Sequence, residues 1–254
     1  MIWLLLALGG ISSGLLAGLL GIGGGTILVP ILVTLGYSYN QSVATSSLAI
    51  VMTSVSGTIQ NWRMGYLNWQ QVILLGLPAV LTALLGAYLV TQLPDYLKEA
   101  AFGILLLTNI FLVTWRKYLL SKDHKEKQAK MNPILARSST GATAGLLAGL
   151  FGVGGGVIMV PLQMLLLGEK IKAAIQTSLG AIVISSIAAC FGHSQAGNVL
   201  GLEGLILGTG GLIGAQVSTR FLPKLPDKVV SFMFRTLLAV LAIYFFWRAS
   251  ISYS

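Results

Sequence analysis

Charged residues and cysteine are both scarce in this sequence. Only 9% of its 254 residues are charged, and Cys190 is the single cysteine. Soluble domains carry about 25% charged residues, so this chain has too few charges to cover a surface in water. One cysteine excludes an intrachain disulfide and a thiolate metal cage. Because 55% of the residues are hydrophobic and the mean hydropathy is +0.85, we predict that most of the chain lies in lipid.

Acidic residues and histidine are also rare, with seven Asp or Glu and two His. The apolar segments contain no pair of carboxylates for a proton relay and no ligand cluster for a metal. They also lack a nucleophile, base and acid that could form one site. We therefore predict a protein that is not an enzyme and that uses no metal or cofactor. The net charge of +9 comes from basic residues dispersed among short loops, which argues against nucleic-acid binding.

The chain contains an internal repeat. Residues 14–31 read GLLAGLLGIGGGTILVPI and residues 145–162 read GLLAGLFGVGGGVIMVPL, identical at 13 of 18 positions. Apolar composition alone would not align six glycines and a proline, so we infer a duplication. At an offset of 132 the match continues through Leu93-Pro94-Asp95 with Leu225-Pro226-Asp227 to Trp115-Arg116 with Trp247-Arg248. We predict one membrane repeat over 1–120, a polar basic linker over 121–133 and a second repeat over 134–254.

Ten apolar segments are predicted to be helical. They are 2–21, 24–39, 42–61, 69–91 and 96–116, then 134–152, 155–168, 173–192, 199–222 and 227–248. A span of the ~30 Å hydrocarbon core takes about 20 residues. The second segment of each half is shorter, so two interpretations stay open: ten spans, or eight full spans with two short or re-entrant helices. The predicted fold class is an all-α polytopic membrane protein with a twofold internal repeat.

The distribution of basic residues predicts the orientation of the halves. Cytoplasmic loops collect Lys and Arg, so the basic linker is predicted to be cytoplasmic. Five crossings per half invert the second half and place most other loop cations on that same side: Arg63, Lys170, Lys172, Arg220, Lys224 and Lys228. Lys98 and Arg248 would then lie outside. Four crossings per half would move most of these cations outside, so the charges favour an inverted repeat.

Each half contains a run of glycines that should break a helix. The runs are Gly21-Ile22-Gly23-Gly24-Gly25 and Gly152-Val153-Gly154-Gly155-Gly156. Each glycine costs a helix about 1 kcal/mol relative to alanine. A helix restarting at Thr26 or Val157 points free N–H groups and a positive dipole end at the break, which suits an anion. Close helix packing through small residues is the alternative. We predict anion binding by Gly23, Gly24, Gly25, Gly154, Gly155 and Gly156.

Polar side chains that follow the breaks are further candidates for binding a substrate. Hydroxyl and amide groups can donate hydrogen bonds without the desolvation cost of a charge. The duplicated Thr45-Ser46 and Thr177-Ser178 pairs are the first candidates, with Gln176, Asn61 and the aligned His193 as weaker ones. The alternative is ordinary interhelical bonding of Ser and Thr in a membrane bundle.

These motifs resemble the TauE/SafE family of membrane permeases. The resemblance is carried by GLLGIGGGTILVP from Gly18, Ala44-Thr45-Ser46-Ser47, the loop containing Gly65, GLFGVGGGVIMVP from Gly149 and Gln176-Thr177-Ser178. It covers nearly the whole chain. It implies transport of a small sulfur-containing anion, such as sulfite, sulfoacetate or a related sulfonate, across a bacterial inner membrane. The family is usually drawn with seven to nine spans, fewer than the ten segments that we count.

We expect a secondary transporter that exports such an anion by alternating access, with the lipid bilayer and the anion as its partners. An anion channel or an importer of a related oxyanion is an alternative with the same site. A membrane scaffold that transports nothing is a more remote one. The substrate, the coupling ion and the oligomeric state do not follow from the sequence.

Overall fold

The computed structural model describes the backbone of residues 2–122 and 132–253, and the side chains of residues 2–111 and 132–251. Within these ranges all regular structure is helical, which confirms the predicted fold class. The first half contains α1 (Ile2–Leu20), α2 (Gly25–Thr34), α3 (Tyr39–Arg63), α4 (Trp69–Leu89), η1 (Val90–Gln92) and α5 (Asp95–Lys122). The second contains α6 (Pro133–Phe151), α7 (Gly156–Leu166), α8 (Ile171–Gln195), α9 (Gly201–Phe221), η2 (Leu222–Lys224) and α10 (Asp227–Tyr253). Most of the predicted linker, residues 123–131, lies outside the described residues.

The ten predicted segments correspond to the ten α-helices, with differences at their ends. The segment predicted over 24–39 is shorter, because Gly36 at φ 94° closes α2, which ends at Thr34. The next segment begins earlier than predicted, because Ser38 and Gln41 form a capping box that starts α3 at Tyr39. Among the described residues, five elements are long and apolar enough to cross a membrane: α1, α3, α4 extended by η1, α8 and α10. The short apolar helices are α2 and α7.

Helix α2 folds back along α1. A Cβ on Gly24 would overlap the hydroxyl of Ser13, and a Cβ on Gly9 would lie 3.1 Å from the Ile31 side chain. Helices α1 and α2 are therefore antiparallel where they contact each other. In the second half a Cβ on Gly155 would lie 2.6 Å from the carbonyl oxygen of Ala144, which places α7 against α6 in the same way. The chain therefore reverses direction at each glycine break and returns along the preceding helix as a short helix, α2 or α7.

The two halves interlock through small residues. Helix α1 packs on α9 and α6 packs on α4, so each half supplies a partner for the first helix of the other. On α1, a Cβ on Gly10 would overlap the Leu207 carbonyl oxygen, and one on Gly14 that of Gly211. Such contacts bring helix axes close, as is usual where membrane helices associate. The halves are therefore one folding unit.

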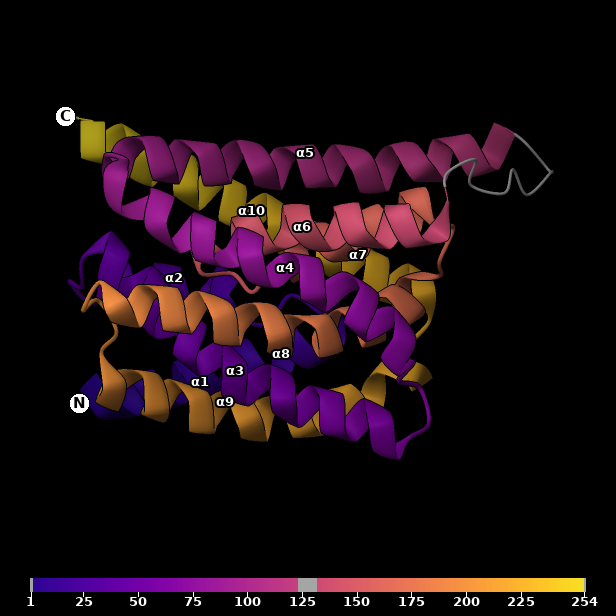
Figure 1. Cartoon of the computed structure of the whole chain (residues 1–254), viewed down its shortest axis with the longest axis horizontal. Helices are drawn as coiled ribbons and strands as arrows, with labels where there is room; N and C mark the ends of the chain where they lie inside the picture. The colour runs from indigo at the N-terminus through magenta and orange to yellow at the C-terminus, as the bar shows by residue number, and fades with distance from the viewer. Residues whose placement is uncertain (1, 123–131, 254) are drawn as a thin grey trace.

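Figure 1 shows the chain termini at the same end of the bundle, and the end of α5 and the start of α6 at the opposite end. We call these the terminal end and the linker end. Helix α1 begins at the terminal end, whereas α6, its counterpart in the repeat, begins at the linker end. Helices α5 and α10 pack together, and their aromatic rings join a cluster in which Phe102 lies 4.9 Å from Phe151 and 4.5 Å from Phe245, between ring centroids.

Candidate functional site

The two glycine runs lie against each other in the middle of the bundle. A Cβ on Gly25 would overlap the carbonyl oxygen of Gly152, and a Cβ on Gly156 would overlap that of Gly21. A Cβ on Gly154 would lie 3.7 Å from the Cα of Gly23. We call residues 21–25 and 152–156 together the glycine centre. No side chain fits at Gly25 or Gly156, so these two equivalent positions of the duplicated motif have a shared steric cause.

The glycine centre contains buried backbone donors without acceptors. All of its residues are buried. The carbonyls of Gly24 and Gly155 already accept bonds from the first turns of α2 and α7. By contrast, the amides of Gly23–Gly25 and Gly154–Gly156 donate to no acceptor among the residues that the structure describes. Buried N–H groups in proteins are nearly always paired, so two sets of unpaired ones beside two helix N-termini make this centre the candidate for binding an anion.

Side chains from α1, α2 and α8 border this centre. The Ser13 hydroxyl donates to the Gly24 carbonyl at 2.9 Å, and the Ser185 hydroxyl donates to that of Gly154 at 3.2 Å. The Thr26 side chain is fully buried and its Oγ1 has no partner among the described residues. Thr26 lies in the first turn of α2, beside the unpaired amides. Its hydroxyl is therefore a further donor available at this helix end.

Two isoleucines pack on the glycine centre from opposite repeats. Both Ile50 of α3 and Ile182 of α8 would contact a Cβ on Gly23 or Gly154, at 3.0–3.2 Å. They are equivalent at an offset of 132 and both are fully buried. Apolar side chains on this side keep water from the amides, which strengthens any electrostatic interaction there.

The predicted serines are close to the centre but in different ways. The Ser46 hydroxyl lies 2.8 Å from the Gly152 carbonyl oxygen, so α3 of the first half contacts the break of the second. Ser178, its equivalent, instead accepts a bond of 2.9 Å from the Gln163 side chain of α7. Gln176 is buried on α8 at 6% exposure. Of the predicted side chains, Ser46 is the one seen bonded to a glycine break.

The predicted threonines lie at the starts of other helices. Thr45 Oγ1 accepts a bond of 3.1 Å from the Leu200 amide, which precedes α9. Thr177 Oγ1 donates to Gln71 in the first turn of α4 at 3.3 Å. Helix α9 begins at the terminal end and α4 at the linker end (Figure 1). The structure therefore separates this pair, and each threonine bonds a neighbouring helix.

Asn61 and His193 are likewise apart. Asn61 lies near the end of α3 and His193 near the end of α8, so one is at the linker end and the other at the terminal end (Figure 1). Both are fully buried. Neither polar atom of the Asn61 amide has a partner among the described residues, and the same is true of His193 Nδ1. His193 Nε2 lies 3.0 Å from the Gly149 carbonyl oxygen.

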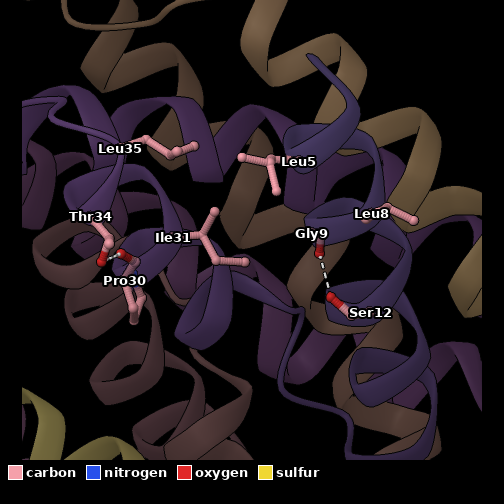
Figure 2. Close-up of a pocket in the computed structure, with 8 residues that line it drawn as sticks. All are labelled: Leu5, Leu8, Gly9, Ser12, Pro30, Ile31, Thr34 and Leu35. Carbon is pink, nitrogen blue, oxygen red and sulfur yellow. Dashed lines mark hydrogen bonds between the residues drawn. The ribbon is translucent and has the colours of Figure 1, made fainter. Parts of the chain in front are cut away.

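A separate groove lies between α1 and α2 on the outer side of this hairpin (Figure 2). Its volume is about 530 Å³, and its lining is mostly aliphatic: Leu5, Leu8, Gly9, Ser12, Pro30, Ile31, Thr34 and Leu35. The Ser12 and Thr34 hydroxyls donate to carbonyls of their own helices, Gly9 and Pro30. The groove therefore offers no free donor and is unsuited to an anion.

The sequence analysis did not select Ser13, Thr26, Ile50 or Ile182. The repeat itself carried a signal for the two isoleucines, since they align at an offset of 132. Thr26 follows the glycines directly and could have been found by its position. Ser13 could not, because its counterpart in the repeat is Ala144. Within the described ranges, no group of three or more His, Cys, Asp or Glu residues could hold a metal ion.

A bundle of apolar helices with interlocked repeats and a buried, amide-rich double break defines a polytopic membrane protein of the transporter class. Comparison with known proteins agrees. The profile of the family described as "Sulfite exporter TauE/SafE" matches residues 6–245. The chain therefore belongs to the TauE/SafE family, and it is a membrane transporter rather than an enzyme.

Individual relatives extend the likeness along most of the chain. A probable membrane transporter protein of Methanocaldococcus jannaschii is 28% identical over 76% of this chain and 72% of its own length. The probable membrane transporter protein YunE of Bacillus subtilis is 25% identical over 95% of this chain and 96% of its own. A probable membrane transporter protein of Haemophilus influenzae is 28% identical over 76% of this chain and 74% of its own length. Their names specify transport and leave the substrate open.

Proposed function

We propose that this protein is a secondary transporter that exports a small sulfur-containing oxyanion, such as sulfite or sulfoacetate, by alternating access. The observation that carries the proposal is the glycine centre, where two sets of buried, unpaired amides lie at two facing helix N-termini. A sulfite or sulfonate group has three oxygens that can accept such N–H bonds. The family description, which names sulfite export, supports this class of substrate.

In this proposal the amides of Gly23–Gly25 and Gly154–Gly156 bind the anion. The Thr26 hydroxyl and Ser46 lie next to these amides and complete the shell, with Ser178 as the counterpart of Ser46. Thr45, Thr177 and Gln176 act outside the shell, by holding the starts of α9 and α4 or by packing. No full positive charge is required, so the bound anion can also leave.

The proposed transporter has inverted halves, with the linker end in the cytoplasm of a bacterial cell. Opposite starting ends of α1 and α6 support the inversion (Figure 1). The linker end also carries the end of α3 with Arg63, the start of α8 with Lys170 and Lys172, and the junction of α9 with α10. Basic residues concentrated at one end support its assignment to the cytoplasm.

The test is flux in proteoliposomes that contain the purified protein. Vesicles loaded with sulfite, sulfoacetate or sulfate are diluted into buffer without anion, and efflux is followed with time. We expect saturable flux for a sulfur oxyanion, and competition between the substrates. Flux no faster than in protein-free vesicles, for all three anions, would contradict the proposal.

The anion channel with the same site differs in one measurement. A channel conducts its anion down the gradient, and substrate on the opposite side does not accelerate the flux. It also gives unitary currents in a planar bilayer. We expect no such currents. Trans-stimulation of efflux by external substrate is the positive sign of alternating access.

A further inference from the structure

The imidazole of His193 is fixed in one tautomer by the single hydrogen bond that its ring makes with the described residues. Its Nε2 lies 3.0 Å from the Gly149 carbonyl oxygen. A carbonyl oxygen can only accept, so Nε2 carries the hydrogen. In the neutral ring Nδ1 then has a lone pair and no hydrogen, and this atom is buried without a partner among the described residues. Neutral His193 can therefore accept a bond at Nδ1 but cannot donate one to an anion. It donates there only after binding a proton.

Asn61 occupies the equivalent position in the first repeat, at an offset of 132. Its amide is fully buried and both polar atoms lack partners among the described residues. The Thr219 hydroxyl, also buried and unpartnered, lies close by on α9: a Cβ on Gly57, one turn before Asn61, would be 3.3 Å from it. Unlike His193, this pair has donors at any pH, since an amide and a hydroxyl do not titrate in the physiological range.

The two positions lie symmetrically about the glycine centre. Asn61 is 11 residues beyond Ile50 on α3, and His193 is 11 residues beyond Ile182 on α8. At ~1.5 Å per residue each is about 16 Å from the centre along its helix. The structure therefore places a buried, unsatisfied polar side chain toward each end of the bundle. Buried groups of this kind call for a ligand or for water.

We propose that His193 is a proton-dependent anion-binding station at the terminal end, and that Asn61 with Thr219 is its proton-independent counterpart at the linker end. The inference rests on the proposed function, which supplies the oxyanion. At the terminal end Nδ1 takes a proton from the water of that side as the anion arrives. It returns the proton to the same side when the anion leaves, so no net proton transfer is required. Lower pH on that side strengthens anion binding there.

Few ionisable groups compete with His193 for this role. Helices α4 and α6 lie against the end of α8, through Ala87 and Gly149. At this level α4 contributes only the exposed Tyr88, while α6 and α7 contribute no ionisable group. Helix α1 has none within its described residues. Among the described residues, the remaining ionisable groups toward the terminal end lie on α3, α5, α8, α9 and α10 and just before α3: Tyr37, Tyr39, Asp95, Tyr96, Lys98, Glu99, Cys190, Glu203, Tyr244 and Arg248. The charged ones have partners: Lys98 pairs with Asp95, Arg248 pairs with Glu99, and Glu203 accepts a bond from the Tyr37 hydroxyl.

The experiment measures uptake of sulfoacetate into proteoliposomes whose protein orientation is assigned by trypsin cleavage at the linker lysines. A sulfonate stays ionised throughout, so the pH of the medium changes the protein rather than the substrate. External pH is varied between about pH 6 and pH 8, where imidazole ordinarily titrates, with the lumen strongly buffered. For protein exposing the terminal end, we expect the half-saturating concentration to rise at least about tenfold as external pH rises. For protein exposing the linker end we expect no such change.

The decisive variant is His193→Asn, which copies the residue of the first repeat. It should lose the pH dependence of the half-saturating concentration at the terminal end, and His193→Gln is a second amide variant in case the first does not fold. Thr53→Val is the matched control, because the Thr53 hydroxyl is buried but bonded within its own helix to Ala49. It should keep the pH dependence of the wild type. Saturable uptake without pH dependence in the wild type, or pH dependence that survives His193→Asn, would overturn this inference alone. Absence of any saturable uptake would overturn the proposed function together with it.

Discussion

Gly156→Ala is expected to lower oxyanion flux at least about tenfold. The new methyl group would overlap the Gly21 carbonyl oxygen and push the two halves of the glycine centre apart. Amides that bind an anion together would then lose their common geometry. Each hydrogen bond to a charged group is worth about 1.5–3 kcal/mol, and about 1.4 kcal/mol corresponds to a factor of ten in affinity. The measurement is initial flux per mole of folded protein in proteoliposomes.

Gly141→Ala is the matched control for this variant. A Cβ on Gly141 would also overlap a carbonyl oxygen, that of Leu75, but on the α4–α6 contact away from the glycine centre. The steric damage is of the same kind, and neither position has a positive φ. We expect Gly141→Ala to lower the thermal midpoint and to keep flux per folded molecule. Equal loss of flux in both variants would mean that the glycines serve packing alone, and would contradict the anion site.

Asp95→Asn should destabilise the protein far more than Asp227→Asn, although the two aspartates are equivalent in the repeat. The Lys98 side chain is 2% exposed, and its ammonium lies 2.6 Å from Asp95 and 2.8 Å from the Asn40 side chain. Removal of the carboxylate leaves a buried charge without an opposite charge. Such losses cost about 3–5 kcal/mol when both partners are buried. Because Asp95 is about half exposed, we expect about 2 kcal/mol.

In the second half, Asp227 pairs at 3.4 Å with Lys172, whose side chain is 26% exposed. An exposed pair of this kind is worth about 0–1 kcal/mol. Both aspartates are the first residue of a helix, α5 or α10, and asparagine has nearly the same shape, so each variant loses the same charge at the same kind of position. The difference between the thermal midpoints of the two variants in detergent therefore measures the effect of burying Lys98. Similar midpoints for the two variants would contradict this account of Lys98.

The helices were predictable because each has a long apolar run and an internal copy. Errors fell at helix ends, where single residues decide the boundary: Gly36 closes α2 early, and the Ser38–Gln41 capping box opens α3 early. Hydropathy cannot locate such ends, since the residues around them are apolar or neutral on both sides. The duplication predicted a glycine break in each half, and the contacts of Gly25 with Gly152 and of Gly156 with Gly21 add that the two breaks meet.

The side chains around the site were harder to predict. The repeat made Thr45 and Thr177 look like a pair, yet they bond to α9 and α4 at different ends of the bundle. Residues equivalent in sequence meet only where the two halves contact each other at the glycine centre. Gly23 and Gly154 lie there, as do Ile50 and Ile182. Distance from that centre is a three-dimensional property that alignment of the two halves does not contain.

The packing of α1 against α9 has a consequence for assembly of the protein during its synthesis on the ribosome. Leu207, which contacts Gly10, is made 197 residues after it. At about 5–20 residues per second, α1 leaves the ribosome roughly 10–40 s before its partner. Throughout that interval the glycine face of α1 lies against lipid or against the insertion machinery. The helices of this chain can therefore enter the membrane one after another, but the bundle cannot assemble until α9, the last helix but one, has been made.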